Sequence, residues 1–381
     1  MSPLGTALIG LGKVAHTHAS ALASLAESRF VAVCDSDLGR CKEFAKTYGV
    51  RAYQRLDELL RDPEVAVVNV CTPHPAHAVV AIATATAGRH VLVEKPMAVR
   101  LSDCDAMIAA AAAHGVKLGV ISQRRFYEPV VRVRRAIAER RLGTPVLGTL
   151  TVLGWRSEDY YRMEPWRGTW SGEGGGVLVS QVTHHLDLFQ WFMGPVAEVF
   201  GYWANVNHPS IEVDDTAVAV LRFLNGALGA IVVSNSQKPG LFGRIHVHGS
   251  TGASVGVQTE TGSSFIAGVT AEVEPPINDI WTIPGEDDLL ASWQQDDVER
   301  AARVDIMHHY HRLQIEDFLE AVLEDRPPLV SGEDGRKSVE LFTGIYRSQD
   351  TGEPVRFPLE PAGPGLSAAE HGGGPPNVGE G

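Results

Sequence analysis

The stretch EGGGVLVSQVTHHLDLFQW, residues 173–191, places two adjacent histidines and an aspartate in an apolar segment behind three glycines. His184 and Asp187 lie three residues apart, so on a helix they share a face and can meet one ligand. A histidine, with a pKa of about 6.5, is suited to removing a hydroxyl proton. We interpret the segment as a catalytic helix. The alternatives are a metal site and a histidine buried for packing.

The metal alternative is disfavoured by the spacing of the histidines. His185 points about 100° away from His184 on a helix, so one face cannot present both, and we expect His185 to be structural or solvent-facing. HHYH at 308–311 supplies more histidines, with His308 and His311 on one face. No cysteine or carboxylate joins them at ligand spacing, so a satisfied polar helix and no metal are expected.

A glycine turn supplies a second kind of chemistry. GLGKVA at 10–15 follows the first strand pattern, within the apolar run TALIGLG at 6–12, and opens a helical pattern. Its first glycine permits a tight turn, its second lets a pyrophosphate approach the backbone, and Ala15 allows close helix–strand packing. The helix start then directs amides and a partial positive charge at the phosphates. An ordinary glycine-rich turn is the alternative. The expected cofactor contacts are Gly10, Leu11, Gly12, Lys13 and Val14.

Asp35 indicates which dinucleotide is bound. It ends the second strand pattern, 23 residues after Gly12. A carboxylate at this place accepts hydrogen bonds from a ribose 2′-hydroxyl and repels a 2′-phosphate, which favours NAD. Ser36 and Arg40 could still bind a phosphate, so NADP stays possible.

The glycine turn requires a particular scaffold. Over residues 1–121, continuous apolar strands alternate with helical patterns, which indicates a parallel sheet with helices on both faces. We therefore predict an α/β protein whose N-terminal domain, 1–121, is a Rossmann dinucleotide-binding domain.

The pattern changes after this domain. Following a helix at 128–141, several strand-like runs succeed one another, and NGA at 225–227 signals a hairpin. We predict an α+β domain over 122–360 with a large open, mainly antiparallel sheet and two late helices. Residues 361–381 are rich in Gly and Pro and are expected to be disordered.

Composition narrows the class of protein. A chain of 381 residues, 44% hydrophobic and 21% charged, suits two soluble globular domains. The net charge of −13 disfavours nucleic acid or an anionic membrane as partner. No apolar run is long enough for a membrane span, and no leader is apparent at the N-terminus. The four scattered cysteines suit reduced thiols, so a cytoplasmic location is expected.

Four motifs in order make the interpretation more specific: GLGKVAHTH, CTPHPAH, EKP at 94–96 and GGGVLVSQVTHHLD. Together they resemble the glucose–fructose oxidoreductase / inositol dehydrogenase / MocA (Gfo/Idh/MocA) family. The resemblance implies hydride transfer between a nicotinamide and a secondary alcohol carbon of a sugar or cyclitol. It also implies that the open sheet makes oligomer contacts, so a homodimer or homotetramer is expected.

The same resemblance implies the roles of single residues. Lys95 would point at the substrate, where an ammonium stabilises a developing alkoxide; the alternative is a surface ion pair with Glu94. Tyr160 or Tyr161 would lie by the substrate, although an aromatic lid packed on the second domain is an equal alternative. The implied cofactor contacts are Thr72, Pro73, His77, Glu94, Lys95, Gln123, Trp166 and Arg167. The implied substrate contacts are Lys95, Arg124, Tyr160, Gln181, His184 and Asp187, although a helix-start salt bridge is equally open for Arg124 or Arg125.

Ser180 departs from the family pattern, which has an aspartate there, then three residues, then His-x-x-Asp. Serine cannot act as the base or fix a histidine tautomer as a carboxylate does, so more of the task falls on His184 and Lys95. The predicted protein is an NAD(P)-dependent sugar or cyclitol dehydrogenase or reductase. The alternatives are a glycoside-cleaving enzyme that retains its NAD and a silent sugar- or NAD-sensing regulator.

Overall fold

The computed structural model describes residues 2–259 and 275–360. The segment 361–381, predicted to be disordered, lies outside the described residues. The chain forms two compact units: Met1–Phe126 with Asp305–Arg336, and Tyr127–Val304 with the chain from Lys337 onward. The first unit therefore takes in a late segment that the sequence pattern assigns to the second domain.

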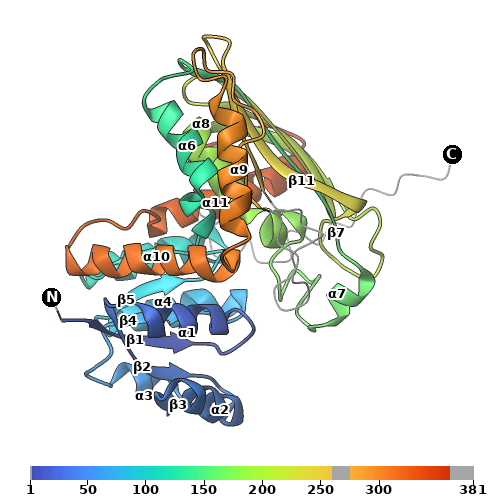
Figure 1. Ribbon diagram of the computed structural model, residues 1–381. Helices are drawn as coiled ribbons and strands as arrows, with labels where there is room; N and C mark the ends of the chain where they lie inside the picture. Colours follow the sequence, from blue (N-terminus) through green and yellow to red (C-terminus); the bar gives the residue numbers. More distant parts are fainter. Residues whose placement is uncertain (1, 260–274, 361–381) are drawn as a thin grey trace. The chain divides into compact units, whose positions relative to one another are not determined.

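The first unit is built on a six-stranded parallel sheet (Figure 1). Its strands are β1 (Leu4–Ile9), β2 (Ser28–Cys34), β3 (Arg51–Tyr53), β4 (Val67–Val70), β5 (His90–Val93) and β6 (Leu118–Val120). They lie in the order β3-β2-β1-β4-β5-β6, and every pair is parallel. The order reverses direction between β1 and β4, which is where open α/β sheets bind ligands. The predicted Rossmann architecture is confirmed.

The helices of this unit follow the predicted alternation with the strands. They are α1 (Ala15–Ser24), α2 (Leu38–Tyr48), α3 (Leu56–Leu60), α4 (His77–Thr86) and α5 (Leu101–Ala113), with short 3-10 turns η1 (His74–Ala76) and η2 (Gln123–Phe126). Local chemistry sets the ends of α2. The Asp37 carboxylate accepts a hydrogen bond from the amide of Arg40 at the start of the helix. At its end, Gly49 has a φ of 68°, which a residue without Cβ adopts most easily.

Helix α10 (Ile306–Leu323) belongs to the first unit because its apolar face completes the core there. Ile315 and Phe318 are buried in one cluster with Leu22 of α1 and Leu92 of β5. At Gly119 in β6, an added Cβ would lie 2.7 Å from the Phe318 ring, so the strand and α10 pack closely. Periodicity alone predicts this helix but cannot assign its partner.

The second unit contains a seven-stranded mixed sheet. Its strands are β7 (Pro145–Trp155), β8 (Val196–Ala204), β9 (Thr216–Phe223), β10 (Leu228–Ser234), β11 (Ser236–Gly249), β12 (Ser254–Thr259) and β13 (Val355–Arg356). They lie in the order β12-β11-β7-β10-β9-β8-β13. Only the β7–β10 pair is parallel among the described pairings, so the sheet is mainly antiparallel as predicted.

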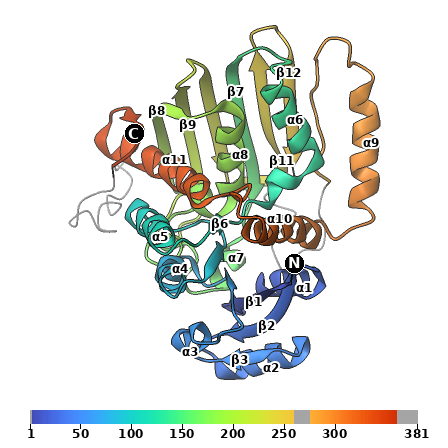
Figure 2. The same ribbon diagram turned by 90° about the vertical axis from the view of Figure 1, so that its left-hand side faces the viewer.

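The helices of this unit leave one face of its sheet open. They are α6 (Glu128–Ala138), α7 (Glu158–Arg162), a π-helical turn η3 (Val177–Gln181), α8 (Thr183–Met193), α9 (Leu289–Ala301) and, from Lys337 onward, α11 (Gly332–Thr351). Figure 2 shows α6 and α8 along one face of the sheet. On this side the Phe189 ring of α8 packs over Gly148 and Gly229, where a Cβ would leave too little room.

The opposite face of the sheet exposes apolar side chains. Tyr202, Val218 and Val232 are 66%, 46% and 37% exposed and occupy paired positions on β8, β9 and β10. Among the described residues, no helix combines the length and the apolar character that crossing a membrane demands.

Candidate active site

The glycine turn leaves room for a phosphate group. Gly10 has a φ of 84°, and an added Cβ would lie 2.6 Å from the amide nitrogen of Thr72. At Gly12, in contrast, an added Cβ would meet no atom within 4 Å, so the space beside this backbone is open. The amide of Ala15 begins α1 by bonding to the carbonyl of Gly12 at 3.1 Å. These features fit the pyrophosphate of a dinucleotide.

The Asp35 carboxylate is buried at the carboxyl end of β2. Its Oδ2 accepts a hydrogen bond from the amide of Leu11 at 2.8 Å, and its Oδ1 accepts one from the amide of Asp37 at 2.9 Å. The Arg40 guanidinium lies 3.6 Å from the same Oδ2, so this predicted phosphate ligand pairs with a carboxylate. Asp35 is therefore fixed beside the glycine turn, where the sequence places a ribose hydroxyl.

Two orphaned oxygen atoms line the predicted cofactor region. The hydroxyl of Thr72 and the Oε1 of Gln123 are buried and have no hydrogen-bond partner within the part of the chain that the structure describes. A bound group with donors would satisfy both oxygens. The predicted contacts Lys13 and Pro73 are exposed at their turns, whereas Val14 and Gly10 are partly buried.

His77 holds two backbone segments together. Its ring is fully buried, with Nδ1 2.9 Å from the carbonyl oxygen of Pro96 and Nε2 2.8 Å from that of Thr72. Burial lowers the pKa of His77, although these carbonyls favour its protonated form. The side chain thus joins the start of α4 to the segment behind Lys95.

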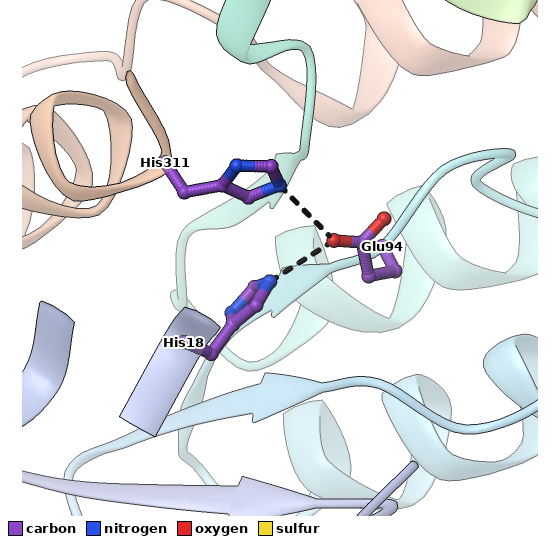
Figure 3. Close-up of side chains that lie close together, drawn as sticks. All are labelled: His18, Glu94 and His311. Carbon is purple, nitrogen blue, oxygen red and sulfur yellow. Dashed lines mark hydrogen bonds and ion pairs between the residues drawn. The ribbon is translucent and has the colours of Figure 1, made fainter. Parts of the chain in front are cut away.

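Glu94 lies at the centre of a buried cluster from three elements (Figure 3). Its Oε1 is 3.0 Å from Nε2 of His18 in α1 and 3.6 Å from Nε2 of His311 in α10. Its Oε2 accepts a hydrogen bond from the backbone amide of Lys95 at 3.0 Å. Burial opposes the charge of Glu94, but the hydrogen bond from His18 and the neighbouring His311 ring outweigh it and hold the pKa of Glu94 well below the usual range. The cluster fixes the strand end that carries Lys95.

The cluster corrects the expectation that no carboxylate joins the histidines at 308–311. The three donor atoms lie within 4.8 Å of one another, a spacing that a metal ion would also accept. Hydrogen bonding accounts for the contact between His18 and Glu94, however. The Asn69 amide lies 3.0 Å from Nδ1 of His18 and donates to it, which leaves the ring proton on Nε2, toward Glu94. Nδ1 of His311 donates to the carbonyl of Met307 at 2.7 Å.

The remaining predicted residues of the first unit surround this strand end. Lys95 is half-buried, and Arg124 and Arg125 are buried in η2. Arg125 donates to the carbonyl of Leu329 at 3.2 Å and pairs with Asp334 at 3.4 Å. Of the two arginines that the sequence offers for the substrate, Arg125 is thus held in the helix-start ion pair that formed the alternative.

In the second unit, a buried aspartate anchors the turn before α8. Asp214 Oδ1 accepts hydrogen bonds from the amide of Gly176 at 2.7 Å and the hydroxyl of Tyr346 at 2.6 Å. Its Oδ2 accepts one from the amide of Leu178 at 3.0 Å. Burial raises the pKa of Asp214 against these hydrogen bonds. At Gly176, an added Cβ would collide with the carbonyl of Asp214, so this glycine is required by close backbone approach.

Helix α8 buries the predicted catalytic pair. His184 and Asp187 are 7% and 5% exposed. His185 is also buried, with Nε2 2.9 Å from the Thr259 hydroxyl of β12, so of its two predicted placements the structure favours the structural one.

Tyr160 lies close to two guanidinium groups. The central carbon of Arg167 lies 4.2 Å, and that of Arg156 5.1 Å, from the centroid of its ring. The Tyr160 hydroxyl accepts a hydrogen bond from Nε2 of Gln181 at 3.2 Å, and Asn235 donates to Oε1 of Gln181 at 2.9 Å. Three predicted residues, Tyr160, Gln181 and Arg167, are therefore adjacent in space. Trp166 joins them, since Arg167 also lies 4.9 Å from its ring.

Sequence reasoning missed several residues of these networks. Glu173 bonds to Ser180, Asp214 anchors the turn at Gly176, and His18 and Asn69 position Glu94. Glu173 stands next to the glycines of the motif, but only the fold gives it a partner seven residues along the chain. Each of the others depends on contacts between distant segments, which no spacing in the chain reveals.

The comparison with known proteins agrees with both units. The model described as "Oxidoreductase family, NAD-binding Rossmann fold" matches residues 4–122, and the "GFO/IDH/MocA C-terminal domain" model matches residues 130–255. The chain belongs to the Gfo/Idh/MocA family of oxidoreductases. Its first unit is an NAD-binding Rossmann domain.

Proteins similar to this chain include dehydrogenases. The chain is 29% identical to myo-inositol 2-dehydrogenase from Thermotoga maritima, over 92% of this chain and 97% of the relative. It is 30% identical to the uncharacterized oxidoreductase YrbE from Bacillus subtilis, over 65% of this chain and 72% of the relative. Among solved structures, the WlbA dehydrogenase from Bordetella pertussis in complex with NADH and UDP-GlcNAcA is 29% identical, with a TM-score of 0.82 over 94% of this chain and 99% of that one.

Proposed function

We propose that this oxidoreductase transfers hydride between the nicotinamide of NAD and a secondary alcohol carbon of a sugar, sugar derivative or cyclitol. The observation that carries the proposal is the placement of Lys95. Its half-buried side chain follows β5 at the carboxyl end of the sheet that bears the glycine turn, and its backbone amide is bonded to Glu94. The relative named for myo-inositol and the similar structure solved with NADH and UDP-GlcNAcA support the substrate class.

In the proposed reaction, each residue has a distinct task at the substrate hydroxyl. The bound nicotinamide supplies or accepts the hydride. The ammonium of Lys95 polarises the substrate oxygen and stabilises its negative charge. His184 takes the hydroxyl proton during oxidation and returns it during reduction. Asp187, three residues along α8, orients His184 or binds a second hydroxyl.

Replacement of Lys95 by Met tests the proposal. The change keeps the apolar stem and removes the charge, so we expect kcat/KM to fall by about 100-fold or more. Affinity for NAD should stay within about threefold, because the glycine turn and Asp35 are untouched. The assay is the absorbance of reduced nicotinamide with a panel of sugars, sugar acids, nucleotide sugars and inositols, and NAD affinity is measured by calorimetry.

Lys46→Met is the matched control, because Lys46 is exposed in the last turn of α2 and the substitution is the same. It should retain full activity. Near-native turnover of Lys95→Met would overturn the assigned role. Net cleavage of a glycoside without accumulation of NADH would favour the oxidation–elimination–reduction alternative, and silence with every compound would favour a sensor.

We also propose that copies of this chain associate through the open face of the seven-stranded sheet. The row formed by Tyr202, Val218 and Val232 is apolar and crosses three adjacent strands. Covering such a row removes apolar surface from water.

A further inference from the structure

Glu173 is a buried carboxyl group within the second unit. The residue is 1% exposed and immediately precedes the three glycines of the motif. Its Oε1 accepts a hydrogen bond from the hydroxyl of Ser180, and its Oε2 accepts one from the amide of Gly168 at 2.6 Å. The carboxyl group therefore links the loop at Gly168 to η3 and lies beside the glycines at 174–176.

Ser180 is the position at which the chain departs from the pattern of its family, which has an aspartate four residues before the histidine. In the structure, Glu173 places a carboxyl group against the hydroxyl of Ser180. We infer that Glu173 is a positioning residue of the proposed reaction, which acts through Ser180 and supplies the negative charge that an aspartate at position 180 would carry beside His184. The inference rests on the proposed function and deepens it.

Three groups around Glu173 favour its charged form against the effect of burial. Burial raises the pKa of Glu173, and this is the larger effect; the hydrogen bonds from Ser180 and Gly168 and the nearby Arg167 guanidinium oppose it. A buried carboxylate without such partners would be costly. The charged and titratable groups that face it are Arg167, Asp214, Tyr160, Tyr161 and Tyr346.

The charge of Glu173 also reaches the predicted substrate side. It raises the pKa of Tyr160, after the larger effect of burial. Tyr160 accepts the hydrogen bond from Gln181, which follows Ser180 in η3. One carboxylate thus acts on the segment that carries Ser180, Gln181 and, one helical turn later, His184.

The Glu173→Gln substitution separates charge from structure. The amide has the same shape, and its oxygen can accept from the Gly168 amide while its NH₂ donates to the Ser180 hydroxyl, which also accepts hydrogen bonds. The fold should therefore be retained. We expect kcat to fall at least about tenfold, with KM changed less than about threefold, and the acid limb of the kcat–pH profile to move.

A second readout needs no substrate. The pKa of His184 can be followed by NMR titration, with its signal assigned by its loss in His184→Gln. Removing the negative charge behind Ser180 should lower this pKa, because a nearby negative charge favours the protonated imidazole. Absence of dehydrogenase activity in the parent protein would overturn the proposed function, whereas this titration tests the inference by itself.

A double variant tests whether a carboxylate at position 180 can replace the one at position 173. Glu173→Gln with Ser180→Asp moves the carboxylate to the position it has in the family pattern, and should recover most of the lost kcat and the His184 pKa. Ser180→Asp alone sets two carboxyl groups against each other and should be less active than the double variant. Glu212→Gln is the matched control, because this exposed carboxylate of the same unit also accepts from a backbone amide, that of Trp170.

Two results would overturn the inference: Glu173→Gln with kcat within twofold of the parent and an unchanged His184 pKa, or a double variant no better than Glu173→Gln. Loss of activity with a matching loss of thermal stability would assign Glu173 to the fold alone.

Discussion

The hydrogen bond between Tyr346 and Asp214 offers a quantitative test of how the turn before α8 is held. Tyr346→Phe removes the hydroxyl that donates to Asp214 Oδ1 at 2.6 Å. The ring keeps its edge-to-face contacts with Trp170 and Trp203, whose centroids lie 5.4 and 5.6 Å away. The substitution therefore isolates one buried hydrogen bond to a carboxyl group.

The expected cost follows from the burial of both partners. Tyr346 is 2% exposed and Asp214 is fully buried, so water cannot replace the lost donor. Hydrogen bonds to charged groups contribute about 1.5–3 kcal/mol, and we expect Tyr346→Phe to lower the free energy of unfolding by about 2 kcal/mol. Asp214→Asn should cost at least as much, because its NH₂ group only donates and leaves one of the two backbone amides without an acceptor.

Urea unfolding of the two single variants and the double variant forms a double-mutant cycle. The double variant should lose about 1 kcal/mol less than the sum of the single losses, because Asp214→Asn already weakens, by removing the charge of the acceptor, the hydrogen bond that Tyr346→Phe removes. Tyr48→Phe is the control, since this ring is only half-buried and lies in the first unit, away from Asp214. A Tyr346→Phe variant within about 0.5 kcal/mol of the parent, at an unchanged slope, would refute the reasoning.

Two further predictions concern acid stability and assembly. Burial opposes the ionisation of Asp215, but His208 and two backbone amides outweigh it and lower its pKa to about 2. Because folding lowers the pKa of Asp215, its ionised carboxylate stabilises the fold at pH values above the unfolded pKa of about 4. About 2 kcal/mol of stability should therefore be lost as the pH falls from about 4 to 2, and Asp215→Asn should remove this loss in urea titrations. His208 has the opposite sign: its partner Asp215 raises its pKa, so its contribution is present in mild acid and is lost as the pH rises through the raised value. Val218→Glu with Val232→Glu should convert an oligomer to monomers in light scattering, whereas Val79→Glu, 70% exposed on α4, should not; an unchanged mass in the double variant would exclude this face as the interface.

Much of the first unit could be predicted because its signals are local. Gly10 and Gly12 stand between a strand and a helix, and a parallel sheet buried on both faces makes its strands continuously apolar. Asp35 follows from the end of the second strand. Such features depend on residues within a few positions of one another, so spacing alone identifies them.

The sequence also predicted the character of the second sheet, but not its parallel pair. Strands β7 and β10 are separated by more than seventy residues, and their pairing depends on β9 and β11 lying on either side. The predicted first domain, residues 1–121, likewise leaves out α10, whose residues Ile315 and Phe318 pack in the core of the first unit. An amphipathic pattern indicates that a helix packs its apolar face on another element, but it does not identify that element.

By itself, the sequence determined the dinucleotide turn, the alternation of strands and helices, and the family to which the motifs belong, because each is set by neighbours along the chain. Only the tertiary structure decided that Glu94 would be held by His18 and His311, and that Glu173 would stand behind Ser180. A buried charge needs partners wherever the chain can bring them, and packing brings them from distant segments.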